Sequence, residues 1–183
     1  MSIEREKMEY DLVVVGAGPA GLSAAINFKK LCKENGTDYS VCVVEKGSEV
    51  GAHILSGAVL EPTALSELFE NWKEIDDCPV KTEVSEESLK FLTENSSINI
   101  PHIFLPSVMK NKGNFIISLG SFCKWLSQQA ELLGVEIYPG FAASDVIEID
   151  GKLCGIITGD LGITKEGEKG QNFQAGIEIH SKY

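Results

Sequence analysis

Continuous apolar runs, typical of buried strands, alternate along the chain with apolar residues at helical spacing. Together these two patterns predict a mixed α/β protein. Three nearly continuous apolar runs have the character of strands buried on both faces of a parallel sheet; they span residues 10–15, 39–44 and 135–138. Apolar residues at helical spacing predict helices over 22–33 and 120–133. The first strand, the first helix and the second strand together have the length of one βαβ unit.

Shorter elements are predicted between and after these. Residues 65–72 predict a short amphipathic helix, and strands are expected near 90–93, 97–100 and 115–118. Asp150-Gly151 is a strong two-residue hairpin signal between strands at 144–149 and 153–158. The following residues, 159–174, are expected to form a mobile hairpin tip, and 175–183 a half-buried strand.

A glycine-rich turn follows the first strand and opens the first helix. It reads Gly16-Ala17-Gly18-Pro19-Ala20-Gly21. In a dinucleotide-binding βαβ unit, the first glycine permits the tight turn and the second lets the backbone approach a pyrophosphate. The third lets helix and strand pack closely. The free N–H groups at the start of the helix would then hold the pyrophosphate.

An acidic residue, Glu45, ends the second predicted strand. A carboxylate at this place can accept hydrogen bonds from a ribose hydroxyl pair and would repel a 2′-phosphate, which disfavours NADP. The motif alone does not separate NAD from FAD, but the long glycine-bearing loop at 47–57 favours FAD. The alternative is a glycine-rich turn without a ligand and an ordinary surface glutamate.

Charge and composition exclude several classes of function. The chain has 16 basic and 27 acidic residues, a net charge of −11, which speaks against nucleic acid and against broad adhesion to an anionic bilayer. No apolar stretch is long enough to cross a membrane. The five cysteines form no Cys-x-x-Cys pair, so neither a disulfide framework nor a metal site is predicted. Because no nucleophile–base set or close carboxylate pair can be named, no catalytic side chain is predicted.

Several later segments resemble the electron transfer flavoprotein–ubiquinone oxidoreductase family. The resemblance covers essentially the whole chain from Tyr10 in an unbroken order, and its most specific part is the run Gly-Ala-His-Ile-Leu-Ser-Gly at 51–57. The other matching segments are 45–47, 58–62, 113–120, 134–143, 158–163 and 176–183. The resemblance implies an α/β fold, an FAD-binding Rossmann-type three-layer domain with a β-meander. This domain would span residues 1–183, be incomplete at its C-terminus and be interrupted by an inserted segment at about 74–113.

The resemblance also implies which residues bind the cofactor. Gly16, Gly18, Ala20 and Gly21 would hold the FAD pyrophosphate and Glu45 the adenosine ribose, with the 51–57 loop beside the flavin. Lys124 stands where the family often has arginine, and it would meet the FAD diphosphate as a point charge, without the planar fork of an arginine. His53 has the alternative of a hydrogen bond within its own loop. The full set of expected cofactor-binding residues is Gly16, Gly18, Pro19, Ala20, Gly21, Glu45, Lys46, Gly51, His53, Ser56, Gly57 and Lys124.

For the intact protein, the resemblance implies electron transfer from reduced electron transfer flavoprotein to ubiquinone. It implies FAD and a cysteine-ligated [4Fe–4S] cluster as cofactors, and peripheral attachment to a membrane. The attachment would be on the cytoplasmic side in a bacterium, or at the inner mitochondrial membrane in a eukaryote. The cluster ligands and the quinone-binding parts are not expected in these residues, so the chain is interpreted as an N-terminal fragment that is inactive alone and holds FAD weakly.

Two other functions stay open. One is a different flavoenzyme of the same superfamily, such as a geranylgeranyl-reductase-like prenyl-lipid reductase, which the segments 51–62 and 113–120 disfavour. The other is a non-enzymatic FAD-binding module. Electron-acceptor assays and a test for bound flavin distinguish them from the oxidoreductase.

Overall fold

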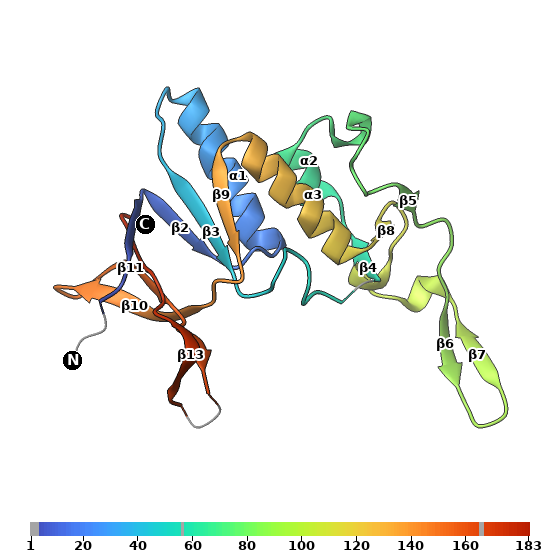
Figure 1. The fold of residues 1–183 in the computed structure, drawn as a ribbon. Helices are drawn as coiled ribbons and strands as arrows, with labels where there is room; N and C mark the ends of the chain where they lie inside the picture. Colours follow the sequence, from blue (N-terminus) through green and yellow to red (C-terminus); the bar gives the residue numbers. More distant parts are fainter. Residues whose placement is uncertain (1–3, 56, 165–166) are drawn as a thin grey trace. The chain divides into compact units, whose positions relative to one another are not determined.

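The computed structural model describes residues 4–55, 57–164 and 167–183 (Figure 1). Spatial contacts divide the chain into two units, which are described separately. Unit 1 comprises residues 1–54 and 123–183, and unit 2 comprises residues 55–122. That the chain forms one FAD-binding domain with an insertion at about 74–113 stays a prediction.

A parallel sheet of three strands forms the centre of unit 1. Its order is β2-β3-β9, with β2 at Leu12–Val15, β3 at Val41–Glu45 and β9 at Val135–Pro139. Residues 41–44 of β3 are buried, as expected for a central strand with both faces covered. The three predicted apolar strands are therefore present, and they pair with one another.

Helix α1 (Pro19–Glu34) covers one face of this sheet (Figure 1). Its Leu22, Ala25 and Ile26 are fully buried. It begins three residues before the predicted start because Pro19 occupies the first helical position, where a missing N–H costs nothing. Helix α3 (Leu119–Leu132) crosses the boundary between the units, and its unit 1 part buries Cys123, Leu126 and Ala130.

A second sheet covers the other face. Its order is β1-β14-β11-β10, with bounds Lys7–Tyr10, Glu178–Ser181, Lys152–Thr158 and Ala143–Ile149. Cys42 and Val44 of β3 pack against Ile156 and Ile179 of this sheet. Because side chains alternate along a strand, Val41 and Val43 face the opposite, helical side. Unit 1 thus has three layers, helices, parallel sheet and β-meander, which agrees with the predicted fold class.

The hairpins of the meander follow their turn residues. Asp150 and Gly151 both have positive φ, 52° and 76°, so this pair closes the β10–β11 hairpin as predicted. The stretch predicted as a hairpin tip contains the two-stranded sheet β12 (Leu161–Ile163) and β13 (Lys169–Gln174). Residues 165–166 of that stretch lie outside the described residues.

The first predicted strand, over residues 10–15, begins only at Leu12. The chain changes sheets at Asp11: β1 ends at Tyr10 in the meander, and β2 begins at Leu12 in the parallel sheet. The Asp11 carboxylate accepts hydrogen bonds from the backbone N–H and the hydroxyl of Ser40 (2.8 and 3.0 Å), and the Ser40 hydroxyl accepts one from the Asp11 N–H (2.9 Å). This reciprocal pairing fixes the break between the sheets.

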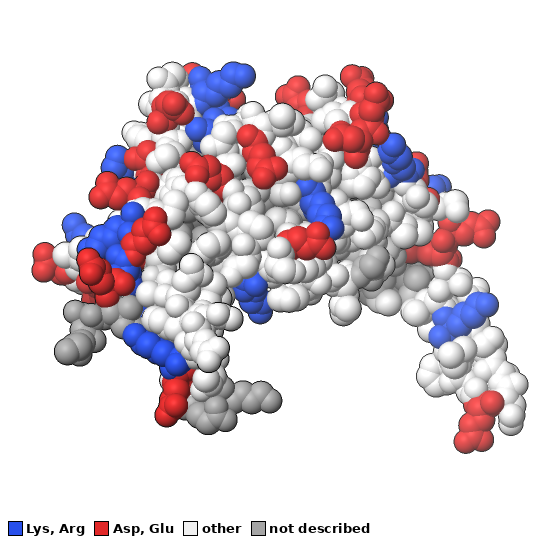
Figure 2. Space-filling model, in the orientation of Figure 1, with Lys and Arg blue, Asp and Glu red and all other residues white. Residues whose placement is uncertain are grey.

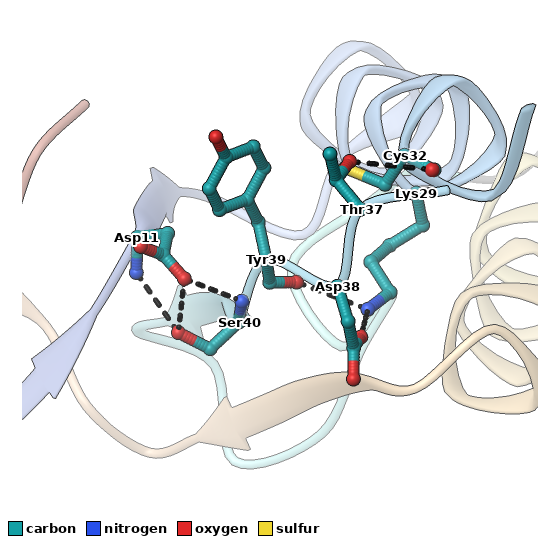
Figure 3. A network of polar contacts seen from close by, with 7 residues as sticks. All are labelled: Asp11, Lys29, Cys32, Thr37, Asp38, Tyr39 and Ser40. Carbon is teal, nitrogen blue, oxygen red and sulfur yellow. Dashed lines mark hydrogen bonds and ion pairs between the residues drawn. The ribbon is translucent and has the colours of Figure 1, made fainter. Parts of the chain in front are cut away.

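The connection from α1 to β3 is held by the same polar network (Figure 3). Lys29 reaches from α1 to donate hydrogen bonds to the Asp38 carboxylate (3.2 Å) and the Tyr39 carbonyl (3.0 Å). The Thr37 hydroxyl donates to the Cys32 carbonyl at the end of the helix (3.2 Å). The network holds the βαβ unit at the amino ends of β2 and β3, whereas the glycine-rich turn lies at the carboxyl end of β2.

Unit 2 contains short strands and one small core. Strands β4 (Ala58–Leu60), β8 (Phe115–Ile117) and β5 (Thr82–Glu83) form an antiparallel sheet in that order, and β6 (Leu89–Leu92) pairs with β7 (Ser97–Ile100). Trp72 packs edge-on against Phe115, with 5.2 Å between ring centroids. The helix predicted to Trp72 ends at Leu68 (α2, Thr63–Leu68), and Trp72 begins a 3₁₀ turn, η1 (Trp72–Glu74). Two more 3₁₀ turns, η2 (His102–Phe104) and η3 (Ser107–Met109), follow β7.

Candidate functional site

The glycine-rich turn joins the end of β2 to the start of α1. Gly16 has φ +100°, a conformation that favours glycine, and its N–H donates to the Val44 carbonyl of the neighbouring strand β3 (2.8 Å). Gly18 caps α1 with extended backbone (φ −80°, ψ 176°) and without a side chain to bond the first N–H groups. The turn therefore presents the free amide groups of the helix start at the carboxyl edge of the sheet.

The three glycines of the motif have different surroundings. A Cβ atom placed on Gly16 or Gly18 would meet no atom within 4 Å, so open space lies in front of both residues. A Cβ atom on Gly21 would lie 2.1 Å from the Gly16 carbonyl oxygen and 3.1 Å from Val14 Cγ1. Gly21 is thus required for the close approach of α1 to the turn and β2, whereas Gly16 and Gly18 leave room for a ligand.

The electrostatics of this space favour an anion. No acidic residue stands in the first turn of α1, where the helix dipole is positive. Pro19 fixes the first helical position, and Ala20 is exposed beside it. Orphan N–H groups, a positive dipole end and small side chains together suit a phosphate or pyrophosphate group.

Glu45 lies next to the turn, at the end of β3. Its two carboxylate oxygens accept hydrogen bonds from backbone N–H groups, Oε2 from Ala17 (2.9 Å) and Oε1 from Gly47 (2.7 Å). Glu45 thus holds the backbone that shapes the turn, and its expected contact with a ribose stays a prediction. A carboxylate has about four acceptor positions, so these two bonds leave capacity for hydroxyl donors.

Sequence reasoning missed the partners of Glu45. Ala17 is 1 % exposed, and its small side chain lies inside the turn while its N–H points to Glu45. Gly47 is buried, and a Cβ atom on it would come 3.1 Å from Glu45 Oε1. The spacing Glu-x-Gly was the available signal, because a glycine two residues after a strand-ending acid allows the backbone to fold back onto the carboxylate.

Lys124 is on α3 within unit 1, and it forms an ion pair with Glu49 (2.9 Å). Both side chains are about half exposed or more. The contact of Lys124 with a diphosphate stays a prediction, and Glu49 is a neighbour that the sequence did not indicate.

The remaining predicted residues follow β3 in the sequence, within residues 46–57. Lys46 and His53 are exposed, and Gly51 adopts a positive φ of 86° in the loop after β3. Gly57 belongs to unit 2 and also has φ 86°. Ser56 lies outside the described residues. The roles assigned to these five residues stay predictions.

Among the described residues, no helix is long and apolar enough to cross a membrane. The five cysteines carry free thiols, and four of them are buried. Burial raises the pKa of the Cys42 thiol to about 12 and that of Cys123 to about 11, so both stay protonated at neutral pH.

Comparisons with known proteins agree with the geometry of the turn. Residues 14–70 match the family model for the NAD(P)-binding Rossmann-like domain. A solved structure of a geranylgeranyl bacteriochlorophyll reductase-like protein from Thermoplasma acidophilum has a TM-score of 0.65 over 96 % of this chain and 38 % of its own, at 21 % identity. At 21 % identity, this similarity shows the fold alone.

Two curated relatives match the chain more closely. A probable electron transfer flavoprotein-ubiquinone oxidoreductase from Acinetobacter baylyi is 56 % identical over 100 % of this chain and 32 % of its own length. The mitochondrial electron transfer flavoprotein-ubiquinone oxidoreductase of Dictyostelium discoideum is 52 % identical over 97 % of this chain and 29 % of its own length. The chain thus spans about a third of the length of the curated relatives it matches. Over its full length, it is a homologue of an N-terminal part of the electron transfer flavoprotein–ubiquinone oxidoreductases.

Proposed function

We propose that unit 1 binds the adenosine diphosphate half of FAD at the β2–α1 turn. The observation that supports this proposal most is the difference in space around the three glycines. Atoms of Gly16 and Val14 occupy the space beside Gly21, whereas open space lies in front of Gly16 and Gly18. In the proposal, the first amide groups of α1 bind the pyrophosphate and Glu45 binds the adenosine ribose.

For a longer protein that contains this chain, the proposed activity is oxidoreduction. Electrons would pass from reduced electron transfer flavoprotein to ubiquinone, as the names of the curated relatives state for those proteins. Bound FAD would supply the electron-carrying chemistry, and the protein would supply position and electrostatics. The [4Fe–4S] cluster and the quinone site are placed, in this proposal, outside these residues.

This activity is tested on the longer protein that contains the chain. Reduced electron transfer flavoprotein is the donor and a soluble ubiquinone analogue the acceptor, and the expected result is quinone reduction that depends on both. Quinone reduction that needs no electron transfer flavoprotein, or reduction of a prenyl lipid, would favour another flavoenzyme. Absence of both activities with FAD bound would favour a binding module.

We further propose that unit 2 attaches the protein to a membrane. Three large apolar side chains after β7 are strongly exposed: Ile103 (82 %), Phe104 (76 %) and Val108 (88 %). Phe91, Leu92 and Ile98 of the β6–β7 hairpin are also exposed, and in Figure 2 this hairpin shows one basic and one acidic patch on an otherwise uncharged surface. Exposed apolar side chains gathered in one part of a protein are typical of a protein or membrane interaction surface. In a bacterium the membrane would be the cytoplasmic one, from its cytoplasmic side, and in a eukaryote the inner mitochondrial one.

Membrane attachment is tested by co-sedimentation with phosphatidylcholine vesicles. Burial of one large apolar side chain is worth about 1.5–3 kcal/mol, so the double change Phe104→Ser and Val108→Ser should weaken binding at least about a hundredfold. Leu132→Ser is the matched control, because Leu132 is 79 % exposed on α3 in unit 1. Equal binding of the wild type and the double variant would contradict the proposed attachment.

A further inference from the structure

Two tyrosines and a glutamate form a hydrogen-bonded cluster between the two sheets of unit 1. Tyr10 ends β1 of the meander, and Glu136 and Tyr138 lie on β9 of the parallel sheet. In the register of β9 with β3, Glu136 lies opposite Cys42, and Tyr138 lies opposite Val44. Because Cys42 and Val44 face the meander, the two β9 side chains point to it as well, and Tyr10 meets them there.

The three side chains bring three oxygen atoms within hydrogen-bond distance of one another. The Tyr138 hydroxyl donates to Glu136 Oε2 (2.5 Å), and the Tyr10 hydroxyl donates to the same oxygen (2.8 Å). The two hydroxyl oxygens are 2.6 Å apart. Each hydroxyl has one proton, so three short contacts share two protons while the carboxylate is charged.

At neutral pH the cluster contains one carboxylate and two protonated phenols. The hydrogen bonds from Tyr138 and then from Tyr10 hold the pKa of Glu136 below its usual range. Burial, and next the hydrogen bond to Glu136, raises the pKa of Tyr138 above its usual range. The pKa of Tyr10 is raised as well, first by burial and then by the hydrogen bond with Tyr138. Both phenols thus keep their protons beside a charged acceptor.

This arrangement suits the one-electron oxidation of a tyrosine. A phenol that loses an electron becomes strongly acidic, so its oxidation is faster when a positioned base takes the proton in the same step. Glu136 Oε2 is such a base, at 2.5 Å from the Tyr138 hydroxyl oxygen. After the transfer, two protons remain among the three oxygens, so the cluster stays hydrogen-bonded. The Tyr10 hydroxyl is then in place to donate to the oxidised Tyr138 oxygen.

We propose that Tyr10 and Tyr138 form a redox-active tyrosine pair, with Glu136 as their shared proton acceptor. Tyr138 gives one electron to a one-electron oxidant, such as an oxygen-derived radical; its O–H bond breaks, and an O–H bond forms on Glu136. The products are a neutral tyrosyl radical, a neutral carboxyl group and the reduced oxidant. A one-electron reductant returns the electron, and the proton goes back from Glu136 to the phenol. None of these residues belongs to the proposed nucleotide site.

The test oxidises the full chain with hexachloroiridate(IV), a one-electron oxidant, and follows the tyrosyl radical by rapid-freeze electron paramagnetic resonance. In the wild type, the rate of radical formation should not depend on the concentration of buffer base, because Glu136 takes the proton. Glu136→Gln should slow radical formation roughly a hundredfold, the lower end of the usual contribution of a positioned base. The rate in this variant should also rise with phosphate concentration, because the proton must then go to the buffer.

The chain's other two tyrosines, Tyr39 and Tyr183, supply the matched control. Both side chains are exposed, and neither hydroxyl is bonded to a carboxylate within the described part of the chain. The double change Tyr10→Phe and Tyr138→Phe should abolish the rapidly formed radical, whereas Tyr39→Phe with Tyr183→Phe should leave it unchanged. Loss of the radical in the second double variant instead would overturn the proposal, because exposure alone would then select the tyrosine.

Glu136→Gln keeps the volume of the side chain, so it tests the proton acceptor even if the double variant of the pair does not fold. Its urea midpoint is measured beside the oxidation rate. A lowered midpoint with the wild-type rate, still independent of phosphate, would mean that the cluster only joins the two sheets, and it would refute the redox role.

Discussion

Gly18 and Gly21 stand three residues apart in one motif, yet their surroundings give them different tasks. The first faces open space at the helix cap, and the second lies against the Gly16 carbonyl. The sequence predicted the close packing at Gly21 correctly, because it follows from the geometry of a strand–turn–helix unit, and the approach of a pyrophosphate to Gly18 stays a prediction.

We expect Gly21→Ala to destabilise the protein by about 1–3 kcal/mol, the usual cost of forcing extra volume into a packed site. The Cβ atom would lie 2.1 Å from a backbone oxygen, so α1 must move away from β2. Urea unfolding followed by circular dichroism measures the change. Gly18→Ala is the control, since its Cβ atom meets nothing within 4 Å; similar losses in both variants would argue against this account.

The ion pair between Lys124 and Glu49 could not be predicted from the sequence. The two residues are 75 positions apart, and neither the helix pattern around Lys124 nor the loop around Glu49 indicates a partner. Their pairing depends on how α3 packs beside the loop after β3 in unit 1, which only the fold determines.

If Lys124 contributes to a diphosphate site, its pairing with Glu49 competes with that role. We therefore predict that Glu49→Gln strengthens FAD binding by up to about fivefold, since an exposed ion pair is worth up to about 1 kcal/mol. Lys124→Ala should weaken binding by a similar factor. Fluorescence titration with FAD measures both. Weaker binding in Glu49→Gln would show that Glu49 itself serves the ligand.

At the scale of elements, helices α1 and α3 and the buried strands followed the apolar pattern, and the break at Asp11 did not. Tyr10 and Leu12 are both apolar enough for a continuous strand, so periodicity could not reveal that they belong to different sheets. The change of sheet depends on the hydrogen bonds between Asp11 and Ser40, two residues far apart in sequence.

Asp11 makes this junction sensitive to acid. Hydrogen bonds from Lys182 and then from Ser40 hold the pKa of Asp11 below its usual range in the folded protein. An unfolded aspartate has a pKa of about 3.9, so the stabilisation is complete above that value and is lost as the pH falls through the lower folded pKa. Asp11→Asn should therefore destabilise the protein more at about pH 7 than at about pH 3.

Urea midpoints of the wild type and Asp11→Asn at the two pH values test this prediction. The difference between the proteins should shrink in acid, because protonation removes from the wild type the same charge that the substitution removes. A difference of equal size at both pH values would mean that the charge of Asp11 does not hold the junction.

At the scale of the molecule, the three layers of unit 1 were predictable and the character of unit 2 was not. The layers followed from the βαβ pattern, the hairpin signal at Asp150-Gly151 and the family resemblance. In unit 2 the sequence correctly predicted strands near 90–93 and 97–100. The exposure of apolar residues such as Phe104 and Val108 could not be predicted, because residue type alone does not show whether a side chain is buried. Whether such a side chain is buried depends on the packing of unit 2, which only the fold determines.

The most direct test of the central claim is a titration of the full chain with FAD, comparing the wild type with Gly18→Ala. The account predicts weak, saturable binding by the wild type and loss of binding in the variant, with unchanged stability. The reason is that the added methyl group fills the space in front of the first amide groups of α1 without touching the fold. Equal FAD binding by the two proteins would contradict the claim that this turn holds the cofactor.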